Sequence, residues 1–495
     1  MSIPTALFIK RRRVRSLLGP SRRWRSSLCH GEEKQRQRLG RPNPSPAPGA
    51  GGGGPPCGPD KRPPRRPPPP RPPPSRHPLG ARHRDALSRR WAHLPRELDA
   101  LDLRLADMLP PRYHRWVHLY NDACSKGTLR HAVRLQIVHS IRRYERRAMR
   151  AFASSTVTSF LQGPRRNVKE LRLDFVVTGN TGCVNALVAE AMDAWGVEDL
   201  EVVAKSTFTR RDGIHLFPSH GLCEQPRLSC LRSLKLGGCT LPSLHEYSRL
   251  SVLVLKGIPK STPAAAYEGI FTLCLQLRVF HLISCGCIAL TLVADAPNSE
   301  IRELVLEDCI FGRLWLRALP CLERLASGCG VVFESSSSFP CLKQWNLTMH
   351  LGIEGQGQHL KLELDTFLEW TPDNITDLVL RLAGPYSGLE LGEEIEWPPT
   401  KLGRHHHLKE FVVAGYEGTT RQVFLAKLVV GACTALQLVA MFKNGYARED
   451  KGGRWGWEMA TQQRHLWTSE EKEKVLKQVM DGVPSSTTPV QVVLG

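Results

Sequence analysis

A short pattern of the form apolar–x–x–apolar–x–apolar recurs along this 495-residue chain and limits its fold more than any other feature. The pattern occurs in eleven copies, of which the first begins at Val168, and the copies are about 26 residues apart on average. Each copy is typical of one short strand. Their last two apolar positions are Leu171/Leu173, Leu200/Val202, Leu234/Leu236, Leu253/Leu255, Phe280/Leu282, Leu304/Leu306, Trp345/Leu347, Leu378/Leu380, Phe411/Val413 and Leu436/Leu438. A degenerate copy has only the first two of its three apolar positions, Leu322 and Leu325. The pattern predicts an array of similar units.

Apolar triplets also arise by chance in a chain of this length, so the residues around the copies matter. In the best copies a cysteine follows the strand by three residues, where leucine-rich repeats place Asn or Cys to satisfy backbone groups; these are Cys239, Cys285 and Cys309. Proline precedes several copies, as in a turn that leads into a strand, at Pro226, Pro320 and Pro340. We therefore expect an α/β fold whose main part is an irregular leucine-rich-repeat solenoid over residues 165–404.

The pattern of residues 405–495 predicts a C-terminal region that differs from the repeat units before it. Residues 408–413 and 435–442 are typical of strands, and residues 421–430 between them are typical of a helix. If the two strands pair in parallel, they form a β–α–β cap on the array, which is expected to be right-handed. A further helix with Ser469 as its N-cap and Met480 as its end is expected next, followed by a terminal strand over residues 489–494.

The net charge of +21 is distributed unevenly. Residues 1–90 contain 22 basic and four acidic residues, whereas residues 91–495 contain 46 basic and 43 acidic residues. The excess of positive charge therefore belongs to the N-terminal tail, and we expect nucleic acid not to be a partner of the body. Binding by the tail itself would be nonspecific and salt-dependent.

Residues 1–85 are expected to be a disordered basic tail. Seventeen of the 37 prolines lie between Arg41 and Pro78, together with a glycine run and without any apolar periodicity. Such a segment cannot bury a core. One basic cluster is a candidate nuclear-localisation signal, although an acid-poor, Arg-rich N-terminus also resembles an organelle transit peptide. The cluster consists of Lys10, Arg11, Arg12, Arg13 and Arg15.

Residues 86–110 carry a resemblance to a known module. The apolar stripe at Leu87, Trp91, Leu94 and Leu98 is typical of a short helix and its exit. The string Leu-Ser-Arg-Arg-Trp at 87–91 resembles the last third of an F-box, with which plant F-box/LRR proteins bind the Skp-type adaptor of a cullin–RING ubiquitin ligase. The ending of the chain resembles the FBD module of the same family, and residues 111–164 are interpreted as a helical linker.

The resemblance implies a substrate-recognition subunit that binds a target protein for ubiquitination through its repeat surface and performs no chemistry. Leu87, Trp91, Leu94 and Leu98 would then contact the adaptor. Residues 55–78 cannot supply the first two F-box helices, because proline disrupts helix interiors. Adaptor binding is therefore expected to be weak or lost, and a ligase-independent leucine-rich-repeat scaffold is the alternative. The residues that bind the target cannot be named from the sequence.

Other classes of function are disfavoured. No GxSxG elbow, dinucleotide-binding turn or CxxC pair occurs, so we expect no catalytic residue, no cofactor and no metal site. The Cys/His groupings at residues 281–287, 321–329 and 405–407 do not have the spacing of a zinc site. Lys427 and Gly431 interrupt the one candidate membrane span. Fifteen cysteines without a secretory signal favour the nucleus or cytoplasm.

Overall fold

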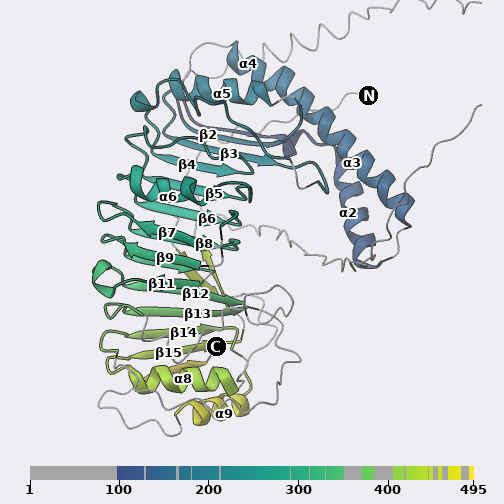
Figure 1. Ribbon diagram of the computed structural model, residues 1–495. Helices are drawn as coiled ribbons and strands as arrows, with labels where there is room; N and C mark the ends of the chain where they lie inside the picture. The colour runs from purple at the N-terminus through teal and green to yellow at the C-terminus, as the bar shows by residue number, and fades with distance from the viewer. Residues whose placement is uncertain are drawn as a thin grey trace, which may run out of the picture. The chain divides into compact units, whose positions relative to one another are not determined.

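The computed structural model (Figure 1) contains a long array of parallel strands within the residues that it describes. These are residues 97–127, 130–162, 167–179, 181–210, 213–289, 291–311, 313–328, 330–350, 371–383, 405–416, 418, 420–443, 445–449, 455–459, 467–480 and 490–494. The expected disorder of residues 1–85 falls outside them.

Thirteen strands form one all-parallel sheet, and this confirms the expected α/β class. The strands are β1 (Glu97–Arg104), β2 (Asn167–Val176), β3 (Asp199–Lys205), β4 (Ser233–Gly237), β5 (Val252–Lys256), β6 (Val279–Ile283), β8 (Glu303–Glu307), β10 (Arg324–Ser327), β12 (Gln344–His350), β13 (Asp377–Ala383), β14 (Glu410–Ala414), β15 (Leu438–Phe442) and β18 (Gln491–Leu494). They lie in chain order across the sheet. Figure 1 shows them stacked one upon the next.

The repeated apolar pattern fixes the register of the sheet. Leu234 of β4 pairs with Leu200 on one side and Leu253 on the other, and the same column runs through the other copies. These side chains are buried in one continuous core that extends from β1 to the last helix. In the degenerate copy Leu322 and Leu325 are both buried in the core, and Ser327 occupies the last of the three positions.

The structure corrects two of the expected assignments: the register of the last strand copy, and the expectation that Leu98 lies on a helix. The last copy uses Val439 and Met441, which pair with Phe411 and Val413, instead of Leu436 and Leu438. Leu436 is the first apolar residue of that unit, three positions earlier.

The second correction concerns Leu98, which was expected on a helix. It lies in β1 and pairs with Val168 of β2. Leu98, Leu101 and Leu103 repeat the apolar unit, so the sheet starts at Glu97 and not near residue 165. The helical spacing of Leu87, Trp91 and Leu94 does not continue into this segment.

Four helices cover the core side of the sheet, and Figure 1 shows α5 near one end and α8 with α9 at the other. They are α5 (Gly182–Asp193), α6 (Ala264–Leu273), α8 (Thr420–Ala432) and α9 (Ser469–Met480). The expected parallel pairing around α8 is confirmed. The expected final helix is also confirmed, but Thr468 is its N-cap, because the Thr468 hydroxyl accepts from the Glu471 amide and the Glu471 carboxylate accepts from the Thr468 amide.

A second parallel sheet, absent from the sequence-based expectation, takes the place of helices in the middle of the array. It consists of β7 (Thr291–Asp295), β9 (Arg313–Ala318) and β11 (Gly330–Phe333). Each of these strands lies in the connection between two consecutive strands of the large sheet. Their buried side chains, among them Leu292, Leu314 and Leu316, belong to the same core.

The expected helical linker proves to be the connection between β1 and β2. It contains α2 (Pro111–Ser125), α3 (His131–Ala151), a π-helical turn (Phe152–Val157) and α4 (Thr158–Leu161). Figure 1 shows α2 and α3 as an antiparallel hairpin. The hairpin has its own apolar cluster around Tyr120 and Ile141. Glu145 joins it to the β3–β4 loop by accepting bonds from the Phe208 amide (2.9 Å) and the Tyr113 hydroxyl (3.0 Å).

One short hairpin remains, formed by the antiparallel strands β16 (Gly445–Glu449) and β17 (Trp455–Met459). Within the described ranges, no helix combines the length and the apolar character that a bilayer span requires.

A left-handed backbone residue follows several strands at the same place, two positions after the last core side chain of the unit. It has positive φ in five copies, at Gly238, Gly257, Ser284, Asp308 and Gly415. The conformation is favourable for glycine and costs L-residues about 1–2 kcal/mol. Three copies have glycine at this turn position, whereas two copies have a residue with a side chain whose backbone is strained.

Candidate recognition surface

The side chains that alternate with the buried leucines point away from the core. We call the face of the large sheet that carries them the opposite face. Over β1–β4 many of these positions are charged, although Val203 and the buried Gly237 lie on the same face. We call this part the charged surface; it comprises Asp102, Arg104, Arg172, Asp174, Glu201, Lys205 and Lys235. Parallel pairing brings the charges of successive strands side by side, because a strand sends every second side chain to the same face.

Ion pairs link these charges within and between strands. Arg104 pairs with Asp102 in β1 at 2.6 Å. Across β2 and β3, Lys205 pairs with Asp174 at 2.6 Å and Arg172 with Glu201 at 3.4 Å. Exposed pairs of this kind stabilise a fold by about 0–1 kcal/mol, so stability alone does not account for the pattern. The pairs hold charges of both signs next to one another on the surface.

An acidic row borders the charged surface at the start of the strands. Burial raises the pKa of Asp199, and the neighbouring carboxylates of Glu170 and Glu198 raise it further. Arg232 partly offsets this charge by pairing with Glu198 at 3.3 Å. The surface therefore presents both signs of charge in a fixed arrangement, which suits a protein partner with a complementary pattern.

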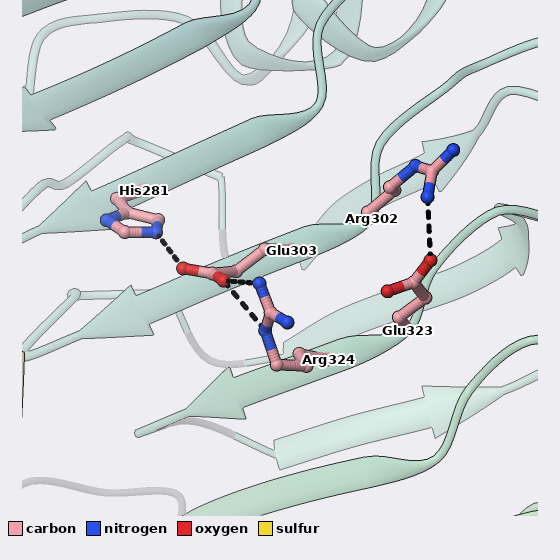
Figure 2. A network of polar contacts seen from close by, with 5 residues as sticks. All are labelled: His281, Arg302, Glu303, Glu323 and Arg324. Carbon is pink, nitrogen blue, oxygen red and sulfur yellow. Dashed lines mark hydrogen bonds and ion pairs between the residues drawn. The ribbon is translucent and has the colours of Figure 1, made fainter. Parts of the chain in front are cut away.

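The opposite face changes character at β6–β10, where it carries a buried polar network (Figure 2). His281 of β6 bonds to Glu303 of β8 at 2.8 Å, and both side chains are 2 % exposed. Arg324 of β10 donates to the second carboxylate oxygen of Glu303 through Nε at 2.8 Å and also through a terminal nitrogen. The Arg324 side chain remains 40 % exposed, so only one end of the network reaches solvent.

This network holds Glu303 ionised. Burial alone would raise its pKa, but the hydrogen bonds from His281 and Arg324 and the charge of Arg324 lower it below the ordinary value. The network connects the three neighbouring strands β6, β8 and β10, and its geometry is that of a structural connection.

Two other buried histidines are also structural. His215 is enclosed by Phe175 and Phe217, neither of its ring nitrogens has a hydrogen-bond partner, and burial lowers its pKa to about 4. His405 accepts from the Leu408 amide at 3.2 Å and contacts the Pro372 carbonyl at 3.2 Å. Among the described residues, no three His, Cys, Asp or Glu side chains are grouped to hold a metal ion.

The cysteines after the strands have the backbone role expected of them. The Cys239 thiol donates to the Gly237 carbonyl at 3.1 Å, and the Cys285 and Cys309 thiols reach the carbonyl oxygens of the preceding strands at 3.3 and 3.2 Å. Burial raises the pKa of Cys239 to about 12. A hydrogen bond with Cys309 lowers the pKa of Cys285, although burial opposes that shift.

Of the residues expected to bind the adaptor, the structure describes only Leu98. Leu87, Trp91 and Leu94 lie outside the described residues, as does the basic cluster from Lys10 to Arg15, while Leu98 is part of β1. The charged surface was not identified from sequence. Its only sequence signal is the set of charged residues between the apolar positions of the first units.

Comparison with known proteins adds no relative: no family model, no curated protein and no solved structure matches the chain.

Proposed function

We propose that this chain is a leucine-rich-repeat scaffold of the F-box/LRR type, with an FBD-like C-terminal region, and that it binds a partner protein through the charged surface of β1–β4. The observation that carries the proposal is the in-register set of exposed charges on one rigid sheet. Recognition residues are most effective when the supporting element holds them in place before binding, because less conformational entropy is then lost. The repeating units in the sequence support the same assignment.

A charge-swapped variant tests this proposal. Arg172→Glu combined with Glu201→Arg keeps the net charge and the ion pair between β2 and β3, but reverses the pattern offered to a partner. We expect the variant to keep its unfolding temperature and to lose the partners that wild-type protein enriches in quantitative affinity capture, by about tenfold or more. Like-charge contacts replace complementary ones across the interface.

The matched control is the same exchange at Arg227 and Glu246, an exposed pair outside the charged surface. This variant should retain the wild-type set of partners. If both variants keep the partners, or if both lose them equally, the charged surface is not the binding site.

A second candidate function, attachment to a cullin–RING ligase, is favoured by the string Leu-Ser-Arg-Arg-Trp at residues 87–91. In this proposal the partner protein is a target for ubiquitination, and a basic cluster from Lys10 to Arg15 directs the protein to the nucleus. Leu98 pairs with Val168 in the large sheet, so we leave it out of the proposed adaptor contact. Leu87, Trp91 and Leu94 then remain to contact the adaptor.

We expect purified full-length chain to bind a Skp-type adaptor weakly or undetectably. Interfaces depend on a few anchors supported by their neighbours, and the loss of two F-box helices should cost several kcal/mol, about a thousandfold in affinity. A pull-down measures this, with a graft of a complete F-box before Leu87 as the positive control. Stoichiometric binding by the unmodified chain would contradict the expectation and favour the ligase function.

A further inference from the structure

The helix α3 concentrates positive charge in the body of the chain. Residues 111–151, which form the α2–α3 hairpin, contain ten basic and two acidic residues, a net charge of +8. The rest of the chain after residue 90 therefore has a net charge of −5. The near-neutral net charge of residues 91–495 conceals the separation between the positive hairpin and the negative remainder. A near-neutral total is therefore compatible with a polyanion partner for the hairpin.

Four of these arginines share one side of α3. Arg143, Arg146, Arg147 and Arg150 are all exposed, and at 100° per residue they fall within an arc of about 100°. The buried residues of α3, such as Ile141, Ala148 and Met149, lie on the other side of the helix. We call these four residues the arginine face.

Within the described structure, neither acidic residue of the α2–α3 hairpin forms an ion pair with the arginine face. Asp122 pairs with Lys126 on α2, and Glu145 is buried against Phe208. None of the four arginines is in an ion pair with any residue that the structure describes; Arg146 and Arg150 only donate bonds of 3.4 Å to carbonyls one turn back. By contrast, the exposed arginines near the strand starts, such as Arg232 and Arg302, do pair with carboxylates.

Helical spacing makes this arrangement unfavourable for the isolated chain. Arg143 and Arg147 are four residues apart, and so are Arg146 and Arg150. Like charges at this spacing destabilise a helix by about 0.2–0.5 kcal/mol per pair, whereas a solvated helix usually mixes both signs. An external anion would remove the repulsion.

From these observations we propose that the arginine face binds nucleic acid through its phosphate backbone, without reading the bases. The chemistry of the side chains selects phosphate. Residues 130–150 contain seven arginines and no lysine, and the planar guanidinium donates two parallel hydrogen bonds to a phosphate group. The half-buried Tyr144 lies between Arg143 and Arg147 in sequence and adds an aromatic ring of the kind on which bases stack.

The site is separate from the charged surface of β1–β4, so the proposal does not depend on the proposed function. Its positive end also adjoins α5. Arg150 and Ser154 line one shallow depression with Gly182 and Cys183, the first two residues of that helix. The partial positive charge at a helix N-terminus adds to the potential of the arginines.

The test measures binding of a fluorescent 20-nucleotide single-stranded RNA to the full-length chain at several salt concentrations. Replacing the four arginines of the face by Gln should weaken binding about tenfold or more near 0.1 M salt. It should also lower the slope of log K against log salt by about 3, because each phosphate contact to a single strand contributes about 0.7. The basic tail is present in wild type and variant alike, so the difference reports the arginine face.

A control variant changes the net charge equally by replacing Arg227, Arg232, Arg278 and Arg302, all in ion pairs, with Gln. It should lose much less affinity; equal loss in the two variants would overturn the proposal. Arg→Lys replacement of the arginine face keeps the charge and should restore most of the salt slope, because the slope depends on the number of charges that contact phosphate; a slope as low as that of the Gln variant would overturn the proposal. Displacement of the RNA by polyglutamate of equal charge would assign the face to an acidic protein and overturn the proposal as well.

Discussion

Replacing Gly238 by Ala should destabilise the protein by about 3 kcal/mol or more, which is the sum of a left-handed backbone penalty and a steric clash. A Cβ atom at Gly238 would lie 2.1 Å from the carbonyl oxygen of Ala204. The obstacle is backbone, so no change of rotamer relieves it. A shift of the turn would strain two hydrogen bonds, from the Gly238 amide to the Lys256 carbonyl (2.9 Å) and from the His215 amide to the Gly238 carbonyl (3.0 Å). Urea unfolding followed by circular dichroism measures the loss.

Gly257 provides the matched control, because it has nearly the same φ (+60° against +61°) and no heavy atom within 4 Å of its would-be Cβ. Gly257→Ala should therefore cost about 1 kcal/mol, the backbone penalty alone. Equal losses at the two positions would show that the turn relaxes around a methyl group and that the clash does not matter.

The same turn position makes the opposite change favourable in two other copies. Ser284 and Asp308 are exposed and have φ values of +51° and +50°. Replacing either by Gly should raise the stability by up to about 1 kcal/mol, because glycine removes the backbone strain of the folded state. The larger entropy of glycine in the unfolded chain offsets part of this gain. The gain should be larger at Ser284, because Asp tolerates the left-handed region better than Ser.

The strands of the large sheet could be predicted because their signal is local. In a unit such as Leu231 to Leu236, the apolar side chains point to one face and the residues between them to the other. The neighbouring unit has the same pattern of apolar positions. The first strand was missed for a physical reason. Leu98 extends both the helical spacing of Leu87, Trp91 and Leu94 and the strand unit that ends at Leu103, and only tertiary pairing with β2 decides between them.

Features that depend on several strands carried no comparable signal. The pairing of Arg172 with Glu201 needs the register of β2 against β3. The strands of the small sheet are short, and a segment such as Thr291–Asp295 has too few residues to distinguish a strand from a connection. The charge count concealed the arginine face because the positive α2–α3 hairpin and the negative remainder nearly cancel. Periodicity therefore predicts the scaffold, whereas the functional surfaces follow from the way strands and helices place charges together.

Removal of the Glu303 carboxylate should have the other large effect, a loss of about 3 kcal/mol in Glu303→Ala. The change leaves His281 buried without its carboxylate partner and removes the acceptor of Arg324. Breaking a buried pair costs about 3–5 kcal/mol, and the lower end applies because Arg324 can turn toward solvent. The matched control is Glu323→Ala, which breaks the exposed pair with Arg302 shown beside the network in Figure 2. That pair should contribute about 0.5 kcal/mol, so similar losses in both variants would contradict a special role for the buried network.

The contribution of Glu303 should also depend on pH in a defined direction. Its pKa in the folded protein is lower than the ordinary value of 4.5, so the unfolded chain takes up the proton first as the pH falls. The stabilisation is therefore complete above about pH 4.5 and is lost as the pH falls through the lower folded-state pKa. Urea unfolding of wild type and Glu303→Gln between pH 7 and pH 3 measures this, since Gln cannot titrate. The difference in unfolding free energy should be constant at neutral pH and shrink below about pH 4.5, whereas a difference that stays constant down to pH 3 would mean that Glu303 does not act through its charge.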